Sequence, residues 1–376
     1  MSHFVVTVCL RDEDVQAKGL DQALTDVMHP FDENERVPYY RHYEDGGPEE
    51  YWWVTAMRQD REEMLKGEGI RPYDPNGPSW SNHGPSTVPE HVQREEQAKH
   101  AAFAERLGEH PTWELVCQLY NECYHPDTQL AVPGEVEDDE VDTERLHFEQ
   151  ETGRAYTWTT YNPESKWDWW VIGGRWQRRL LGLPGIQPQD LVMGRPGSFG
   201  DNGEHVRDNE GRWHCDGGQL HLLDLEATRQ AGVDKALERY DAWYAIVDKH
   251  GAPPIWANLV GQVDAGQLSI EEARRRYNNH PAIQAARDEK IGGFMSSPEE
   301  DFGYSREDFI EMERTNALVG YAMVTLTGEW TAPGRMGWFG MSSESPGELN
   351  AFKIAANKYI DALPSDAWIV NLDCHI

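Results

Sequence analysis

The sequence predicts an α+β protein: a mixed β-sheet formed by N-terminal, central and C-terminal strands, packed with helices and carrying a large helical insertion. Two observations predict this class. Residues 3–10 and 368–376, at the two ends, have the β-rich pattern of strands, whereas residues 222–315 have the apolar spacing of helices. One sheet that joins both ends and is covered by helices satisfies these patterns most simply.

A chain of 376 residues suits one large domain or two to three ordinary ones. We expect an N-terminal and central α+β region over 1–221 and a helical insertion over 222–315. A strand–helix–strand segment over 316–376 then completes the sheet.

The first half of the chain is predicted to be mainly helical after its opening strand. The region 31–47 is polar and aromatic and is predicted as a loop, and the Gly- and Pro-rich region 67–89 is a second loop. A hairpin is predicted around residues 151–154. The predicted helices cover 20–28, 49–66, 90–107 and 111–124.

The second half alternates between irregular and regular segments. The acidic segment 127–142 is predicted to be a solvated loop, and 184–220 is an ordered excursion or a lid. The tail is predicted to contain strands over 317–326, 337–341 and 368–376 and a helix over 346–363.

Composition excludes several classes. No apolar run is long enough to cross a bilayer, so no membrane partner is expected. The first residues are predicted to form a strand and not a signal peptide, and five cysteines favour a reducing cytoplasm. The net charge of -32 argues against general nucleic-acid binding. It indicates high solubility, an acidic face for a basic protein surface or DNA mimicry, or cation binding.

The segment 166–176, KWDWWVIGGRW, contains four tryptophans, a Gly-Gly pair and two cations. Glycine admits close neighbours, and arginine beside tryptophan suits an anion that carries a flat ring. One interpretation is a nucleotide-like pocket in which Asp168 accepts a hydrogen bond from a ribose or base. The other is a corner of the core in which Asp168 pairs with Arg175. The candidate ligand-binding residues are Lys166, Trp167, Trp169, Trp170, Gly173, Gly174, Arg175, Trp176 and Trp338.

Asp373 and His375 lie two positions apart on the predicted terminal strand, so they point to one face and Cys374 points to the other. An Asp–His pair can orient a general base or bind a metal. The alternative is the polar edge of a terminal strand. The candidate catalytic residues are Asp168, Asp373 and His375.

Other chemical motifs are weak. No phosphate-loop, dinucleotide, nucleophile-elbow or HExxH pattern occurs. The Cys and His clusters at 117–125 and 205–221 lack paired zinc-ligand spacing, so neither a metal nor a cofactor is predicted.

Several segments together resemble a family of uncharacterised proteins of tailed bacteriophages and prophages. These are MSHFVVTV with PFDEN near the N-terminus, NPESKWDWW with IGGRW in the centre, and GEW, MGWFG and DCHI near the C-terminus. The helical middle and the Pro-rich loop look like insertions relative to shorter relatives. The resemblance implies a phage origin and a host-cell cytoplasm, without a mechanism.

We therefore expect a phage-encoded accessory protein that binds a host or anti-phage-defence component or a nucleotide signal. One alternative is a hydrolase or transferase acting on a nucleotide or nucleic acid. That enzyme would require Asp168, Arg175 and His375 within roughly 10 Å of one another around a concave site, with Asp373 beside them. The other alternative is a virion or assembly component, which an exposed apolar patch or a repeating self-contact would favour.

Overall fold

The computed structural model confirms the predicted α+β class. The chain forms two compact units, which are described separately: unit 1 comprises Met1–Glu35 and Asn162–Ile376, and unit 2 comprises Arg36–Tyr161. The boundaries of these units differ from those of the three expected regions, 1–221, 222–315 and 316–376. The division into these three regions stays a prediction. The structure describes residues 3–66, 90–126, 132–134, 141–196, 206–292, 297–335 and 342–376.

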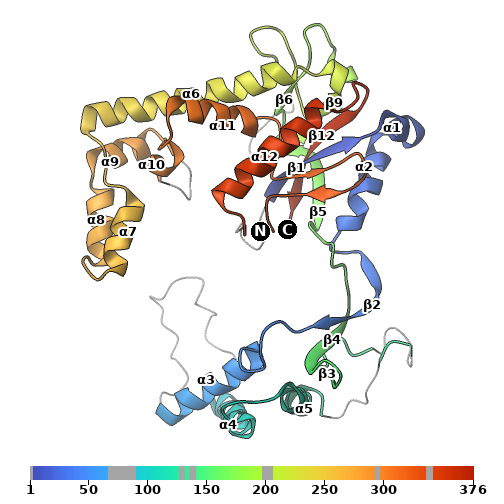
Figure 1. The fold of residues 1–376 in the computed structure, drawn as a ribbon, viewed down its shortest axis with the longest axis vertical. Coiled ribbons are helices and arrows are strands. Elements are labelled where there is room, and N and C mark those ends of the chain that lie inside the picture. Colours follow the sequence, from blue (N-terminus) through green and yellow to red (C-terminus); the bar gives the residue numbers. More distant parts are fainter. Residues whose placement is uncertain are drawn as a thin grey trace. The chain divides into compact units, whose positions relative to one another are not determined.

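A mixed sheet forms the centre of unit 1, and strands from both ends of the chain lie inside it (Figure 1). Its described strands follow the order β11-β10-β1-β12-β5-β7, and β9 pairs with the first part of β12. β1 runs parallel to β10 and antiparallel to β12, while β5 runs antiparallel to β12 and parallel to β7. The strands are β1 (His3–Leu10), β5 (Trp169–Gly174), β7 (Arg195–Pro196), β9 (Gly217–Gln219), β10 (Ala322–Val324), β11 (Trp330–Thr331) and β12 (Trp368–His375).

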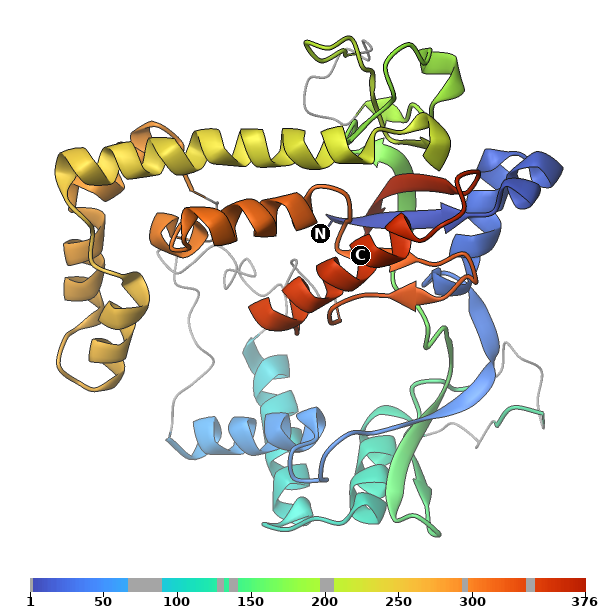
Figure 2. The same cartoon turned by 45° about the horizontal axis from the view of Figure 1, so that its top comes forward.

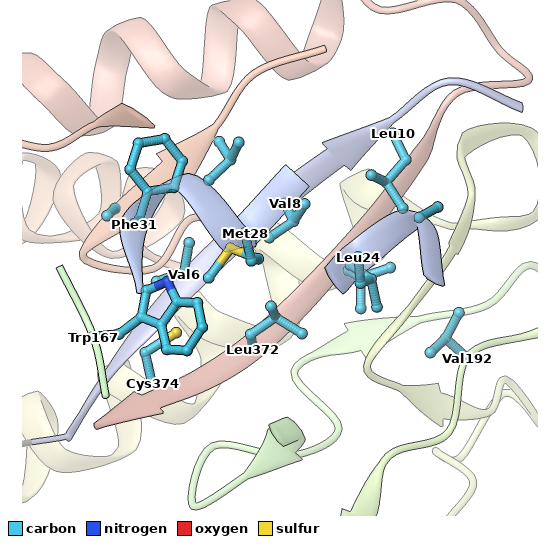
Figure 3. Close-up of a cluster of buried hydrophobic side chains, with 14 of the residues drawn as sticks. Val6, Val8, Leu10, Leu24, Met28, Phe31, Trp167, Val192, Leu372 and Cys374 are labelled. Atoms are coloured by element: carbon cyan, nitrogen blue, oxygen red, sulfur yellow. The ribbon is translucent and has the colours of Figure 1, made fainter. Parts of the chain in front are cut away.

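One face of this sheet is apolar because alternate residues of β1 and β12 point to it. Two short helices and a 3-10 turn cover this face: α1 (Asp12–Lys18), α2 (Leu20–Met28) and η1 (His29–Phe31). Figure 3 shows Leu24, Met28 and Phe31 over Val6 and Leu372, with all five side chains buried. Cys374 belongs to the same cluster, as the alternation of the terminal strand predicts.

The opposite face is apolar near one end of β12 and polar near the other. Ala356 and Ile360 of α12 (Pro346–Asp361) pack against Cys9 and Ile369. Further along the same face, Thr7 Oγ1 donates a hydrogen bond to Asn371 Oδ1 across 2.8 Å. Polar side chains of this face therefore lie near the start of β1 and the end of β12.

The predicted helical insertion corresponds to the helices from α6 to α11, which also belong to unit 1. The long helix α6 lies alongside α11 (Figure 2). A separate apolar cluster joins Tyr240 and Trp243 of α6 to Ile283 and Phe309 of later helices. The helices are α6 (Leu225–His250), α7 (Trp256–Asp264), α8 (Ile270–Asn278), α9 (Pro281–Asp288), α10 (Pro298–Asp301) and α11 (Arg306–Asn316).

Unit 2 combines a second sheet, of order β2-β4-β3, with three helices. Its core includes Trp53, Leu119 and Leu146, which are fully buried. The strands are β2 (Arg36–Tyr43), β3 (His147–Glu149) and β4 (Arg154–Tyr161), and the helices are α3 (Trp52–Lys66), α4 (Glu90–Leu107) and α5 (Trp113–Tyr124).

Two details of the sequence prediction need correction. The hairpin around residues 151–154 forms as expected, but its strands pair within unit 2 and not with the main sheet. The region predicted as a loop over 31–47 contains β2, whose register with β4 is irregular between Arg36 and Tyr40. Pro38 lies inside that irregularity and has no N–H for a ladder hydrogen bond, which explains why the strand pattern is weak.

The excursion over 184–220 is partly regular. It contains β7, β9 and β8 (His214–Cys215), and β8 pairs with β6 (Leu180–Leu181). Several predicted segments lie wholly or largely outside the described residues, namely the loop 67–89, most of the acidic loop 127–142 and the strand 337–341.

Candidate functional site

The tryptophans of segment 166–176 separate into a pair that packs in the core and a pair that is exposed. Trp167 is buried and Trp170 packs beside it, both against the apolar core of unit 1. Trp169 and Trp176 are 44% and 37% exposed. One pair of rings therefore belongs to the core and the other pair is exposed, and the Asp168 carboxylate contacts His375.

Two buried carboxylates explain why the motif contains consecutive glycines. Gly173 and Gly174 both have positive φ, of 76° and 57°. A Cβ on Gly173 would lie 2.9 Å from the carboxylate of Asp216, and a Cβ on Gly174 would lie 2.3 Å from Asp373 Oδ2. Only glycine fits this backbone so close to both side chains. Asp373 Oδ2 also accepts a hydrogen bond from the backbone N–H of Arg175 at 2.8 Å.

Asp168 and Asp373 each contact a histidine. His375 Nδ1 lies 2.6 Å from Asp168 Oδ1, and His3 Nδ1 lies 2.8 Å from Asp373 Oδ1. At these distances each ring N–H donates to a carboxylate. We call His3, Asp168, Asp373 and His375 the His–Asp cluster.

The strand register brings the two pairs together. His3 lies directly opposite His375 in the β1–β12 ladder, and Trp169 lies opposite His375 in the β12–β5 ladder. The centroids of the two imidazoles are 4.9 Å apart with their planes at 72°, and the Trp169 ring stacks on His375 at 5.2 Å. Trp176 approaches His3 at 6.4 Å.

The cluster is largely removed from water. The side chains of His3 and Asp373 are 7% and 2% exposed, and those of His375 and Asp168 are 9% and 26% exposed. His375 Nε2 is buried and has no hydrogen-bond partner within the described part of the chain. A buried polar atom without a partner costs free energy.

Glu33 adds a further carboxylate beside this cluster. Burial and the neighbouring charges of Asp168 and Asp32 raise the pKa of Glu33. Its backbone N–H donates to Trp167 O at 2.8 Å, which anchors the segment after η1 to the segment before β5.

The structure brings together most of the residues predicted from the sequence. Asp168, Asp373 and His375 meet in the His–Asp cluster, and Arg175 joins them through its backbone. Trp167 and Trp170 belong to the core, and the backbone N–H of Lys166 donates to Phe31 O at 2.7 Å. Trp338 lies outside the described residues.

His3 was missed by the sequence interpretation, which treated residues 3–10 only as a strand. The face on which His3 lies could have been predicted, because the alternation of strand residues places His3 on the same face as Thr7. What the sequence lacks is the partner: nothing local indicates that residue 3 lies opposite residue 375.

The described residues contain no group of three or more His, Cys, Asp and Glu side chains arranged to hold a metal ion. None of their helices combines the length and the apolar character needed to cross a lipid bilayer.

Compared with known proteins, the chain matches no family model, no curated protein and no solved structure.

Proposed function

We propose that the His–Asp cluster is the active centre of an enzyme that transfers or hydrolyses a phosphate ester of a nucleotide-like substrate. The observation that carries this proposal is the placement of two imidazoles, each held by a carboxylate, with centroids 4.9 Å apart. Two adjacent imidazoles can act as general base and general acid in one reaction, which a single histidine cannot do simultaneously.

In this proposal one ring removes a proton from the attacking water or hydroxyl, and the other gives a proton to the leaving oxygen. Asp168 and Asp373 act as positioning residues, since each contacts Nδ1 and so directs Nε2 of its partner toward the substrate.

The exposed rings supply the affinity for a flat substrate. Trp169 stacks on His375 and also meets the edge of His3, and Trp176 lies near His3. Nucleobases stack on such indoles with about 1–3 kcal/mol per base. This pairing of aromatic surface with acid–base groups favours a nucleotide over an aliphatic phosphate.

The test is turnover of nucleotide phosphodiesters, including cyclic nucleotides and short oligonucleotides, by the whole chain. His375→Gln should lower kcat/KM by at least about a hundredfold. His29→Gln removes an exposed histidine of the same unit and should leave it unchanged. Equal activity in His375→Gln and the wild type, or no turnover of any of these esters, would overturn the proposal.

The proposed setting is the host cytoplasm, where a phage-encoded accessory protein would act on a nucleotide signal of host defence. The resemblance to tailed-phage proteins supports this setting. A second candidate is binding to a host or defence protein without catalysis, which the net charge of -32 favours because it suits a basic partner. Pull-down from infected cells tests it: a partner retained by His375→Gln would support binding, and recovery of no partner would count against it.

A further inference from the structure

One cavity of unit 1 is lined mainly by positively charged side chains, whereas the protein as a whole is negatively charged. Its volume is about 460 Å³, and its walls come from the segment after β5, from α6 and from the end of α11. The chain has 34 Lys and Arg residues against 66 Asp and Glu residues. This cavity, which we call the basic pocket, has four cations, one histidine and one carboxylate in its lining: Arg178, Arg179, Lys235, Arg239, His214 and Glu313.

Arg179 is fixed at the back of the basic pocket. Its Nη2 donates to Asn316 O at 3.0 Å and to Ala317 O at 3.4 Å, at the end of α11. Both bonds use the same nitrogen, so the remaining N–H groups of the guanidinium have no hydrogen bond to the described residues. Burial lowers the pKa of Arg179, which means that its charge is incompletely solvated.

A buried cation, Lys353, lies close enough to Arg179 to feel its charge. Lys353 of α12 is 8% exposed, and its Nζ donates to Val319 O and Gly320 O. Burial, and then the charge of Arg179, lower the pKa of Lys353 to about 7. The negative charge of Glu313 acts in the opposite direction and raises the pKa of Lys353.

The open side of the pocket carries two exposed cations. Lys235 and Arg239 lie one turn apart on α6, and neither forms a salt bridge with the described residues. The floor between them and α11 is made of small residues. A Cβ on Gly232 would lie 2.7 Å from Ala317 Cβ, so glycine permits the close approach of the two helices.

We infer that the basic pocket binds a small molecule that carries one or more phosphate groups. A phosphate accepts several charge-assisted hydrogen bonds from guanidinium groups, and it would balance the excess of cations. The volume is in the range of small-molecule sites and exceeds that of a single phosphate, so a diphosphate or a phosphorylated metabolite fits. This inference is independent of the His–Asp cluster.

Titration calorimetry with inorganic pyrophosphate, at low ionic strength, tests the inference on the whole chain. The wild type should show saturable binding at one site. The double variant Lys235→Gln/Arg239→Gln should weaken binding at least about tenfold, because two charge-assisted contacts are lost. Both side chains are exposed, so the fold should be retained, which a thermal unfolding curve checks.

Lys249→Gln is the matched control, since it removes one exposed cation from the same helix outside the pocket. It should bind pyrophosphate as the wild type does. No saturable binding by the wild type would overturn the inference. Equal weakening in Lys249→Gln and the double variant would also overturn it, because the effect would then be one of overall charge.

Discussion

His3 and His375 face each other across neighbouring antiparallel strands, and their ring centroids are 4.9 Å apart. The aspartates that contact these two histidines differ in their other hydrogen bonds. The carboxylate of Asp168 contacts His375, whereas the carboxylate of Asp373 contacts both His3 and the backbone N–H of Arg175. The two carboxylates should therefore respond differently to the same substitution.

Asp168→Asn and Asp373→Asn should both lower activity on the proposed substrates, because each releases a histidine from its carboxylate. Asp373→Asn should also destabilise unit 1, by about 1–3 kcal/mol, since its buried carboxylate holds a backbone N–H. Urea unfolding and kcat/KM on both variants separate the effects. Equal losses of stability in the two variants would contradict this assignment of roles.

Gly174→Ala should destabilise the protein strongly. The new Cβ would lie 2.3 Å from Asp373 Oδ2, at a backbone φ of 57°. Gly185→Ala is the matched control, because Gly185 also has positive φ but no atom within 4 Å of the added Cβ. We expect about 1 kcal/mol for the control and about 1–3 kcal/mol more for Gly174→Ala, measured by urea unfolding. Equal losses of unfolding free energy in the two variants would show that the Asp373 carboxylate can move away from the new Cβ at little cost.

Lys353 should make stability increase with pH. Its pKa in the folded chain is about 7, below the unfolded value of 10.5, so between these values the unfolded chain binds more protons. The free energy of unfolding then rises with pH in this window, by up to about 1.4 kcal/mol per pH unit from this group. Lys353→Met should show a flatter dependence.

Urea unfolding of both proteins between pH 7.5 and 8.5, an interval chosen to lie between the two pKa values, measures this difference. The comparison is made below the range where buried thiols contribute a slope of opposite sign. Parallel curves for the two proteins would mean that Lys353 remains charged in the folded state.

The five cysteines should resist thiol reagents in the folded protein. All are buried and free, and burial raises the pKa of Cys9 and Cys215 to about 12. The thiolate is the reactive form, so labelling with a chromogenic disulfide should be slow in buffer and fast in denaturant. Rapid labelling of any cysteine in buffer would show local opening around it.

The sequence was sufficient where the pattern is local. Alternation over 3–10 and 368–376 predicted the central strands, and it placed Asp373 and His375 on one face. It was insufficient where the structure depends on pairing. The contact between His3 and Asp373, and the fit of Gly173 against Asp216, join residues whose neighbours in the sequence give no indication of each other.

The same limit explains the loop prediction for β2. A strand whose pattern is interrupted at Pro38 is recognisable only beside β4, which supplies its hydrogen-bond partners.

The position of β12 constrains how the protein is made. This strand fills the space between β1 and β5, yet the ribosome produces it after every other described strand. Unit 2 is synthesised before β12, whereas β1 must wait for more than three hundred residues for the strand that pairs with its full length. During synthesis the incomplete sheet is therefore exposed and could be bound by a chaperone. A frameshift before residue 368 would remove β12 and leave β1 and β5 without the strand that joins them.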